Sequence, residues 1–514
     1  MRGHRLTLRR RVRPATDAVG GADPRGLGSS RYDRVMAITF TAVRSVPKST
    51  KVRVRLLTTD AVEAGVSELP DGQLDSAGFT GAPGEKHVHP AGGRTEVLVG
   101  VGSASLVDTN AIRSAAAVIG RSFGRYPKLG VELPESELDS AEARRALVEG
   151  IALSTYAFTT YKSDAKRAKL AKVEVAGGAG ARNQAALDQG AAVARGQMLA
   201  RDLVNEPGGE LTPPVFARRA TAMAKERGLT VKVWDEAAIK KGKLGGLLGV
   251  NRGSTIPPRL VELTYTPSGK AKGFLALVGK GITFDAGGLS IKTGQGMMTM
   301  KCDMGGAAAV VGAMSVLADL DVACKVKAWV PMTDNMLGGD ATRPGDVLRI
   351  RNGKTIEVLN TDAEGRLILA DGLSLASEAK PDAIVDLATL TGACMVALGP
   401  KIAGLMSNDD GWAAQIEASS DATGEKVWRL PLPDEYRKHV DSTIADMKNI
   451  GIAHGGALTA GLILQEFVAD GIPWAHLDIA GPAFTESDDA EIVKGGTGFG
   501  VRLLADLAVN FRKP

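Results

Sequence analysis

The second half of the chain contains five strand-length runs that are hydrophobic at consecutive positions rather than at alternate ones. They occupy residues 274–281, 325–332, 382–390, 402–407 and 474–481. Runs of this kind are typical of strands covered on both faces, because a strand with one face in solvent alternates apolar and polar residues. Helical stretches, among them 305–320 and 458–471, separate the runs. The pattern predicts a central mixed sheet flanked by helices, with functional residues in loops at one end of the strands.

The first half of the chain has a similar but shorter alternation. Strand-like segments at 52–57 and 95–102 are followed by helical patterns at 109–123 and 140–156. This order indicates a separate, smaller α/β domain. We predict an N-terminal α/β domain at residues 36–182.

A long helical pattern follows this domain. It runs from about Asn183 to Leu203, after a Gly/Ala-rich break, and it ends at the turn-forming sequence NEPGG. We predict that residues 183–210 form a linker helix and connection to a larger C-terminal domain at 211–514. The expected fold class is therefore α/β with two domains.

Residues 1–35 differ from the rest in charge. Nine Arg and three Asp give this segment a charge of +6, against +5 for the whole chain of 514 residues. The remainder is close to neutral, which removes the electrostatic argument for a nucleic-acid face on the body of the protein. The segment has no apolar core of a secretory signal. Its composition leaves an Arg-rich transit peptide or a nucleic-acid arm open, but favours a disordered extension, encoded from a start codon upstream of Met36.

Composition also limits the cellular setting. The chain is 44% hydrophobic, yet no apolar run approaches the roughly 18 residues of a membrane span. The cysteines, Cys302, Cys324 and Cys394, form no CxxC pair, so neither a disulfide scaffold nor a thiolate zinc site is indicated. A reducing, cytoplasmic setting without membrane association fits best.

Acidic residues gather at three corners of the second half. The sequence NTDAEGRL at 360–367 places Asp362 and Glu364 between an alternating apolar run and a helical run, at a strand-to-helix corner. Asp285 follows Lys280 in the second corner, and Asp303 precedes a Gly/Ala-rich helix start in the third. A single corner of this kind is usually a helix cap or a solvated turn. Three of them predict that the carboxylates meet at one edge of the sheet.

Four carboxylates in one site would repel each other unless cations were present. Two divalent ions would balance Asp285, Asp303, Asp362 and Glu364 in charge. Oxygen ligands without cysteine and without an HExxH helix suit zinc, manganese, magnesium or cobalt. The residues alone leave open whether Lys280 is a neutral ligand or a charged counter-ion. They also leave open whether nearby cations stabilise a reaction intermediate or form surface ion pairs.

These residues resemble the leucyl aminopeptidase (cytosol aminopeptidase) family. NTDAEGRL is similar to the signature octapeptide of that family. VGKGITFDAGGLSIK, MKCDMGGAAAV, VPMTDNM with RPGDVLR, DLATLTGA and WAHLDIAG resemble its other sequence blocks, in the same order. The resemblance covers the chain from about Leu199 to the C-terminus. It implies a catalytic domain that holds two metal ions, Mn²⁺ or Zn²⁺, and assembly as a homohexamer.

The resemblance also assigns roles to residues. It makes the five residues Lys280, Asp285, Asp303, Asp362 and Glu364 metal ligands, with Asp285 and Glu364 as bridging carboxylates. Lys292 corresponds to the residue that polarises the scissile carbonyl, and Arg366 to the one that holds a bicarbonate acting as general base. The pocket for the first side chain would be lined by Met300, Thr389, Gly392 and Ala480. Ala286 departs from the family, which usually has a small hydroxyl residue there.

The implied reaction is release of N-terminal amino acids, leucine and other mainly apolar residues, from peptides with a free N-terminus. Asp303 and one metal would receive the α-amine, and a hydroxide that bridges the metals would attack the carbonyl. One rival is another two-metal hydrolase, such as a phosphoesterase, although those sites normally include several histidines. The other rival is a DNA-binding architectural role, which some relatives have, for the Arg-rich segment or for residues 162–172.

The pair His87 and His89 is assigned no chemistry. It flanks a valine in a Pro/Gly-rich segment. We expect an exposed loop there rather than a metal site.

Overall fold

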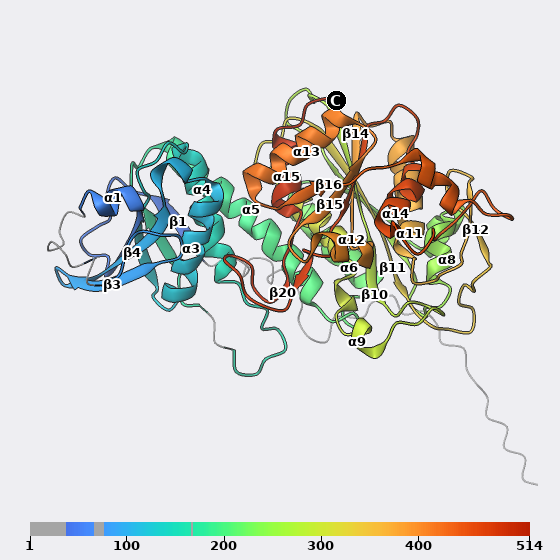
Figure 1. Cartoon of the computed structure of the whole chain (residues 1–514), viewed down its shortest axis with the longest axis horizontal. Helices are drawn as coiled ribbons and strands as arrows, with labels where there is room; N and C mark the ends of the chain where they lie inside the picture. The colour runs from blue at the N-terminus through green and yellow to red at the C-terminus, as the bar shows by residue number, and fades with distance from the viewer. Residues whose placement is uncertain (1–37, 66–73, 75–76, 166–167) are drawn as a thin grey trace, which may run out of the picture.

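The computed structural model describes residues 38–65, 74, 77–165 and 168–514, and every structural statement below refers to these. The predicted disordered extension at 1–35 lies outside the described residues. Figure 1 shows two α/β bodies side by side, joined by the long helix α5. Within the described ranges no helix is both long and apolar enough to cross a membrane.

The N-terminal body contains a six-stranded sheet with the order β1-β6-β5-β2-β4-β3. All neighbours are parallel except β3 and β4. The strands are β1 (Thr39–Ala42), β2 (Val52–Thr58), β3 (Lys86–Ala91), β4 (Arg94–Gly102), β5 (Lys128–Glu132) and β6 (Lys172–Val175). The helices are α1 (Thr59–Glu63), η2 (Ala104–Leu106), α3 (Thr109–Phe123) and α4 (Ser140–Ser154).

The predicted helices of this body are confirmed, and side-chain caps explain where they begin. Asp108 accepts a hydrogen bond from the backbone N–H of Ala111 at the start of α3. Asp139 does the same for Ala141 and Glu142 at the start of α4. Such caps satisfy backbone donors that have no partner within the helix.

The prediction of an exposed loop at His87 and His89 is wrong. Both residues lie on strand β3, and His89 is buried. Their side chains share one face of the strand, and the rings stack with centroids 5.3 Å apart and an interplanar angle of 24°.

A helix is present where the linker helix was predicted, α5 (Ala181–Asn205). Its second half is almost entirely buried, from Ala192 to Asn205. It packs against α4 of the N-terminal body and against α10 and α15 of the C-terminal body. It is therefore a rigidly packed connection between the two bodies rather than a flexible linker.

The C-terminal body contains a nine-stranded mixed sheet with the order β16-β15-β18-β14-β9-β11-β8-β7, and β10 pairs with β11. Its centre is parallel. β8 runs antiparallel to both of its neighbours, β11 and β7, and β15 runs antiparallel to β18. The strands are β7 (Thr230–Trp234), β8 (Arg259–Tyr265), β9 (Phe274–Gly279), β10 (Gly281–Asp285), β11 (Lys325–Asn335), β14 (Ala383–Ala388), β15 (Ala403–Ser407), β16 (Val427–Arg429) and β18 (Trp474–Asp478).

Helices cover both faces of this sheet. α10 (Gly305–Met314), α13 (Asp410–Thr423) and α15 (Val501–Val509) cover one face, and α8 (Gly245–Asn251), α11 (Gly365–Glu378) and α14 (Gly456–Gln465) cover the other. On β14, Val385 and Leu387 join the first core while Ile384 and Ala388 join the second. Two cores explain why the strands are apolar at consecutive positions, and the predicted helix-flanked mixed sheet is confirmed.

Smaller elements complete the body. The helices are α6 (Pro213–Glu226), α7 (Glu236–Lys241), α9 (Gly294–Met297), η3 (Met300–Cys302), α12 (Gly392–Leu398) and η4 (Asp434–Val440). β12 (Val347–Arg349), β13 (Thr355–Glu357) and β17 (Met447–Lys448) form a three-stranded sheet, and β19 (Phe484–Thr485) pairs with β20 (Gly495–Gly496).

A buried polar pair interrupts the second core. Asp386 on β14 and His476 on β18 are in register, and neither side chain is exposed. Asp386 Oδ1 lies 2.6 Å from His476 Nδ1, and Asp386 Oδ2 accepts a 2.8 Å hydrogen bond from the indole of Trp474. Burial lowers the pKa of His476, but Asp386 more than offsets this, and the net pKa is raised.

Asp386→Ala is expected to lower the free energy of unfolding by about 3–5 kcal/mol, because it leaves buried polar partners unpaired. Chemical denaturation followed by tryptophan fluorescence measures the change. The exposed Asp421 on α13 gives a control, Asp421→Ala, with an expected change within about 0.5 kcal/mol. Equal stability of the two variants would contradict a structural role for the pair.

Candidate metal centre

The acidic corners predicted from the sequence meet at the carboxyl ends of the central parallel strands. Lys280 directly follows β9, and Asp285 is the last residue of β10. Asp303 follows η3 at the start of α10, and Glu364 is the N-cap residue of α11. Carboxylate oxygens of Asp285, Asp303 and Glu364 lie within 4.8 Å of one another, and all three residues are buried.

Lys280 lies inside this cluster. Its Nζ is 2.7 Å from Asp303 Oδ1, 2.8 Å from Glu364 Oε1 and 2.8 Å from the carbonyl oxygen of Thr389. Burial would lower the pKa of Lys280, but the carboxylates of Asp303, Glu364 and Asp285 raise it well above its usual value. In the protein alone Lys280 is therefore a charged counter-ion, and it must lose a proton before it can be a metal ligand.

The close approach of Lys280 depends on a glycine. A Cβ atom at Gly365 would lie 2.6 Å from Cε and 2.7 Å from Nζ of Lys280. Any other residue at the start of α11 would push the ammonium group away from Glu364. The glycine of the NTDAEGRL sequence is thus explained by space at the site.

Asp362 joins the cluster through Lys292. The Nζ atom of Lys292 lies 2.8 Å from Asp285 Oδ2 and 2.6 Å from Asp362 Oδ1. Asp362 is more open than the other acids, with its side chain 32% exposed. Gly287 makes this packing possible: its φ is +88°, and a Cβ there would lie 2.8 Å from Asp362 Oδ1.

The donor set fits divalent cations. Asp303 Oδ2 and Glu364 Oε2 are buried and receive no hydrogen bond from the described residues. Burial, and repulsion between the acids, raises the pKa values of Asp285 and Asp303. Unpartnered buried carboxylate oxygens are costly, and a hard or borderline cation is the partner that would offset this cost. Four carboxylates can balance two divalent ions, the arrangement used for metal-assisted hydrolysis.

Arg366 is held at the edge of the cluster. It is buried, and its Nη1 donates a 2.7 Å hydrogen bond to the carbonyl oxygen of Asn449, while its Nε has no partner among the described residues. Burial lowers the pKa of Arg366 to about 10, opposed by the charges of Glu364 and Asp478. A buried guanidinium with a free N–H is suited to bind a small anion.

The predicted pocket residues lie in the turn before Asp303 and in the segments that follow β14 and β18. The hydroxyl of Thr389 donates to Asp303 Oδ1 at 2.7 Å. Gly392 begins α12, and Met300 begins the 3-10 turn before Asp303. The backbone N–H of Ala480 bonds to Asp478, whose carboxylate also accepts from Thr391 Oγ1 at 2.6 Å. These bonds join the loops that follow β14 and β18.

Two residues that organise the site had no assigned role from the sequence. Asn335, at the end of β11, donates to Asp285 Oδ1 at 2.8 Å and to the carbonyl oxygen of Thr361 at 3.0 Å. Asn449 uses its side chain to bind the backbone of Leu359, Asn360 and Ala363. Asn335 belongs to the family-like block VPMTDNM, and this membership could have marked it as a site residue. Asn449 lies in no such block, so the sequence contained no signal for its role. Ala286, which departs from the family pattern, is buried and leaves the contacts of Asp285 intact.

Comparison with known proteins places the chain in a family. The model of the cytosol aminopeptidase family catalytic domain matches residues 198–505, and that of its N-terminal domain matches residues 60–165. A probable cytosol aminopeptidase of Streptomyces avermitilis is 46% identical over 495 residues, which cover 92% of this chain and 96% of that protein. One from Aquifex aeolicus is 46% identical over 408 residues, covering 79% and 82%.

Solved structures show the same architecture. The bottromycin maturation enzyme BotP in complex with Mn has a TM-score of 0.82 and 40% identity, covering 89% of this chain and 98% of that one. A tomato leucine aminopeptidase variant has a TM-score of 0.82 and 33% identity, covering 92% and 96%. The family models, the long relatives and the shared two-domain fold agree: this chain belongs to the cytosol aminopeptidase family and is a peptidase hydrolase.

Proposed function

We propose that this enzyme is a metal-dependent aminopeptidase that releases N-terminal amino acids, leucine and other mainly apolar residues, from peptides. The observation that carries this is the buried cluster of Asp285, Asp303 and Glu364, in which some carboxylate oxygens have no hydrogen-bond partner in the described part of the chain. The family relationship supports peptides as the substrates. The predicted pocket residues Met300 and Ala480 are apolar, which favours an apolar first side chain.

The proposed metal ligands are Lys280, Asp285, Asp303, Asp362 and Glu364. They would hold two divalent ions, and the manganese in the related BotP structure favours Mn²⁺, with Zn²⁺ as the alternative. Ions at this position would activate water for attack and polarise the scissile carbonyl. The acidic centre would also attract the free α-ammonium group of a peptide, which restricts cleavage to the N-terminus.

Lys292 and Arg366 are the proposed catalytic residues. Lys292 supplies a positive charge on the open side of the cluster, where it would stabilise charge developing on the carbonyl oxygen. Arg366 would use its unpartnered Nε to hold a bicarbonate ion that accepts a proton. Met300, Thr389, Gly392 and Ala480 are proposed to line the pocket of the first side chain.

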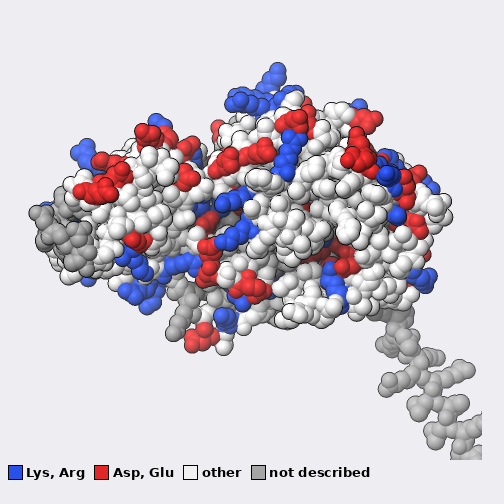
Figure 2. Space-filling model, viewed as in Figure 1, with Lys and Arg blue, Asp and Glu red and all other residues white. Residues whose placement is uncertain are grey.

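The setting of the enzyme is also proposed. We infer a cytoplasmic homohexamer with domains at 36–182 and 211–514, as expected from the family resemblance. A DNA-binding role is less favoured. Figure 2 shows a face on which Lys and Arg are interspersed with Asp and Glu, without the single-sign surface that nucleic-acid binding uses. Another type of two-metal hydrolase is disfavoured by the family models.

The function is tested by comparing leucine amide with N-acetyl-leucine amide. Acetylation removes the charge of the α-amine, and we expect hydrolysis to fall at least about 10³-fold, the scale of a lost charged contact in a buried site. Chelation should abolish activity, and Mn²⁺ or Zn²⁺ should restore it. Equal cleavage of the two amides would overturn the proposal, because it would make the free amine irrelevant.

A further inference from the structure

One segment runs from the metal centre to the N-terminal body. It leaves β18 at Asp478, forms the β19–β20 hairpin and ends at Gly500, where α15 begins. In Figure 1 this dark red hairpin extends toward the N-terminal body beside α5. We call residues 479–500 the active-site hairpin.

The base of the active-site hairpin is part of the site. Ala480 is tied to Asp478, which also holds the loop after β14. Ala483 packs beside Gly305, two residues after Asp303, because a Cβ built on Gly305 would lie 3.3 Å from that of Ala483. A shift of the hairpin base would therefore move the walls around the acidic cluster.

The tip of the active-site hairpin is held by Arg121 of α3. Its guanidinium donates to Asp488 Oδ2 at 2.7 Å, to the carbonyl oxygen of Ala490 at 2.8 and 2.7 Å, and to that of Ile492 at 2.6 Å. Ala490 has a φ of +44°, a left-handed conformation that is unfavourable for a non-glycine residue. Arg121 thus stabilises a strained turn in the other body.

The centre of the active-site hairpin is anchored to α5 by Arg201, which is fully buried. Arg201 donates to the carbonyl oxygens of Thr497 at 2.9 Å, Glu491 at 3.1 Å and Leu153 of α4 at 2.8 Å. Gln197 donates to the same carbonyl oxygen of Thr497 at 3.0 Å. One side chain therefore links the hairpin, the connecting helix and the N-terminal body.

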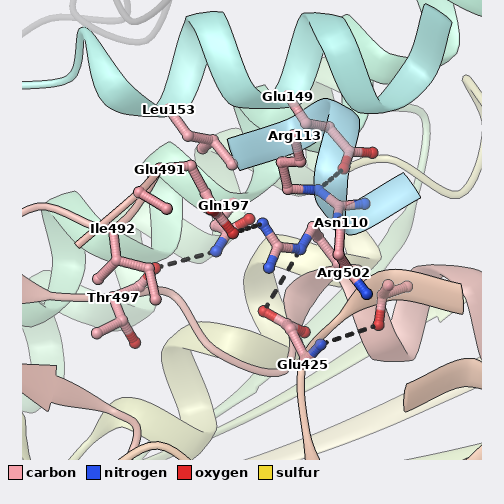
Figure 3. Close-up of polar contacts among 12 residues, drawn as sticks. Asn110, Arg113, Glu149, Leu153, Gln197, Glu425, Glu491, Ile492, Thr497 and Arg502 are labelled. Atoms are coloured by element: carbon pink, nitrogen blue, oxygen red, sulfur yellow. Dashed lines mark hydrogen bonds and ion pairs between the residues drawn. The ribbon is translucent and has the colours of Figure 1, made fainter. Parts of the chain in front are cut away.

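Buried ion pairs lie on both sides of the interface between the bodies, as Figure 3 shows. Arg502 of α15 lies 2.9 Å from Glu491 and 4.0 Å from Glu425. On the other side of the interface, within the N-terminal body, Arg113 of α3 pairs with Glu149 of α4 at 2.8 Å. All five side chains are at most 10% exposed. Breaking buried pairs of this kind is costly, so each pair stiffens its own side of the interface.

We propose that the N-terminal domain positions the active site. Arg121 acts as a positioning residue: it holds the tip of the active-site hairpin, and the base of this hairpin forms one wall of the substrate pocket. This inference rests on the proposed aminopeptidase function. The domain carries none of the metal ligands proposed here, yet it fixes the far end of a segment that begins at them. Removal of the Arg121 contacts would leave the acidic cluster intact and would make only the hairpin wall of the pocket more mobile.

Arg121→Ala tests the proposal. If the ordered hairpin falls to about one fifth of the population, apparent substrate affinity falls by that fraction, so KM rises about fivefold while kcat stays within about twofold. Hydrogen–deuterium exchange of residues 484–496 should speed up in the same variant. Arg121→Lys keeps the charge opposite Asp488 but cannot bind both carbonyl oxygens, so intermediate values are expected.

Arg182→Ala is the matched control. Arg182 is an exposed arginine on α5 that pairs with Asp139 at 3.1 Å, away from the hairpin. Its KM and exchange should equal those of the wild type. The proposal is overturned if Arg121→Ala matches this control, or if exchange rises while KM is unchanged. Absence of aminopeptidase activity in the wild type would refute the proposed function instead. The exchange experiment would still show whether Arg121 orders the active-site hairpin.

Discussion

Asp303→Asn is expected to lower kcat/KM for leucine amide by at least about 10³-fold without unfolding the protein. The amide has nearly the shape of the carboxylate, and it can still accept hydrogen bonds from Lys280 and Thr389 through one oxygen. What it loses is the negative charge and the second oxygen, Oδ2, which has no hydrogen-bond partner among the described residues. A neutral amide binds divalent ions weakly, so both metal retention and amine recognition should fail.

Metal content and activity together check this prediction. Elemental analysis should show fewer ions per chain than in the wild type, and thermal unfolding should show a folded protein. Asp421→Asn, at an exposed position on α13, should leave both quantities unchanged. Full turnover by Asp303→Asn, with a normal metal content, would show that Asp303 is not a ligand.

Lys292→Met is expected to lower kcat by about 10²–10³-fold with little change in metal content. Lys292 is the cation on the open side of the cluster, with its side chain 18% exposed, and it contacts both Asp285 and Asp362. Methionine keeps most of the length and apolar volume but removes the charge. The acids then keep their positions for metal binding, while the developing oxyanion loses its stabilising partner.

The kinetic pattern separates this role from a structural one. A loss in kcat at constant metal content supports transition-state stabilisation, whereas loss of metal would show that Lys292 only holds the acids together. Lys240→Met is the control: Lys240 is 63% exposed on α7 and pairs with Glu236 within its own helix. Its activity should equal that of the wild type.

Local features of the sequence predicted much of the fold. The helix expected at 109–123 has the same limits in the structure, because an apolar face and the Asp108 cap both lie within one short stretch. The consecutive apolar runs predicted strands buried on two faces, as β14 shows. The position of each acid at the end of a strand or the start of a helix predicted that the acids would converge.

Long-range hydrogen bonds were beyond the reach of the same reasoning. Asn335 binds Asp285 across 50 positions of sequence, and Arg366 binds Asn449 across 83. Asparagine is common in turns, so its presence in a loop does not reveal a distant partner. The burial of His89 was missed for a similar reason. Nearby Pro and Gly residues indicated a loop, and nothing in the sequence indicated that this segment pairs with β4.

The sequence by itself determined the alternation of elements, the two-sided burial of the sheet and the identity of the acids, because hydrophobic period and strand-end position are local properties of the chain. Only the tertiary structure decided how Lys280 sits among three acceptors, which neutral groups orient the acids, and that Arg121 of one body holds a hairpin of the other. Those contacts join residues up to 371 positions apart. Their partners are selected by the packing of whole layers, which no local pattern encodes.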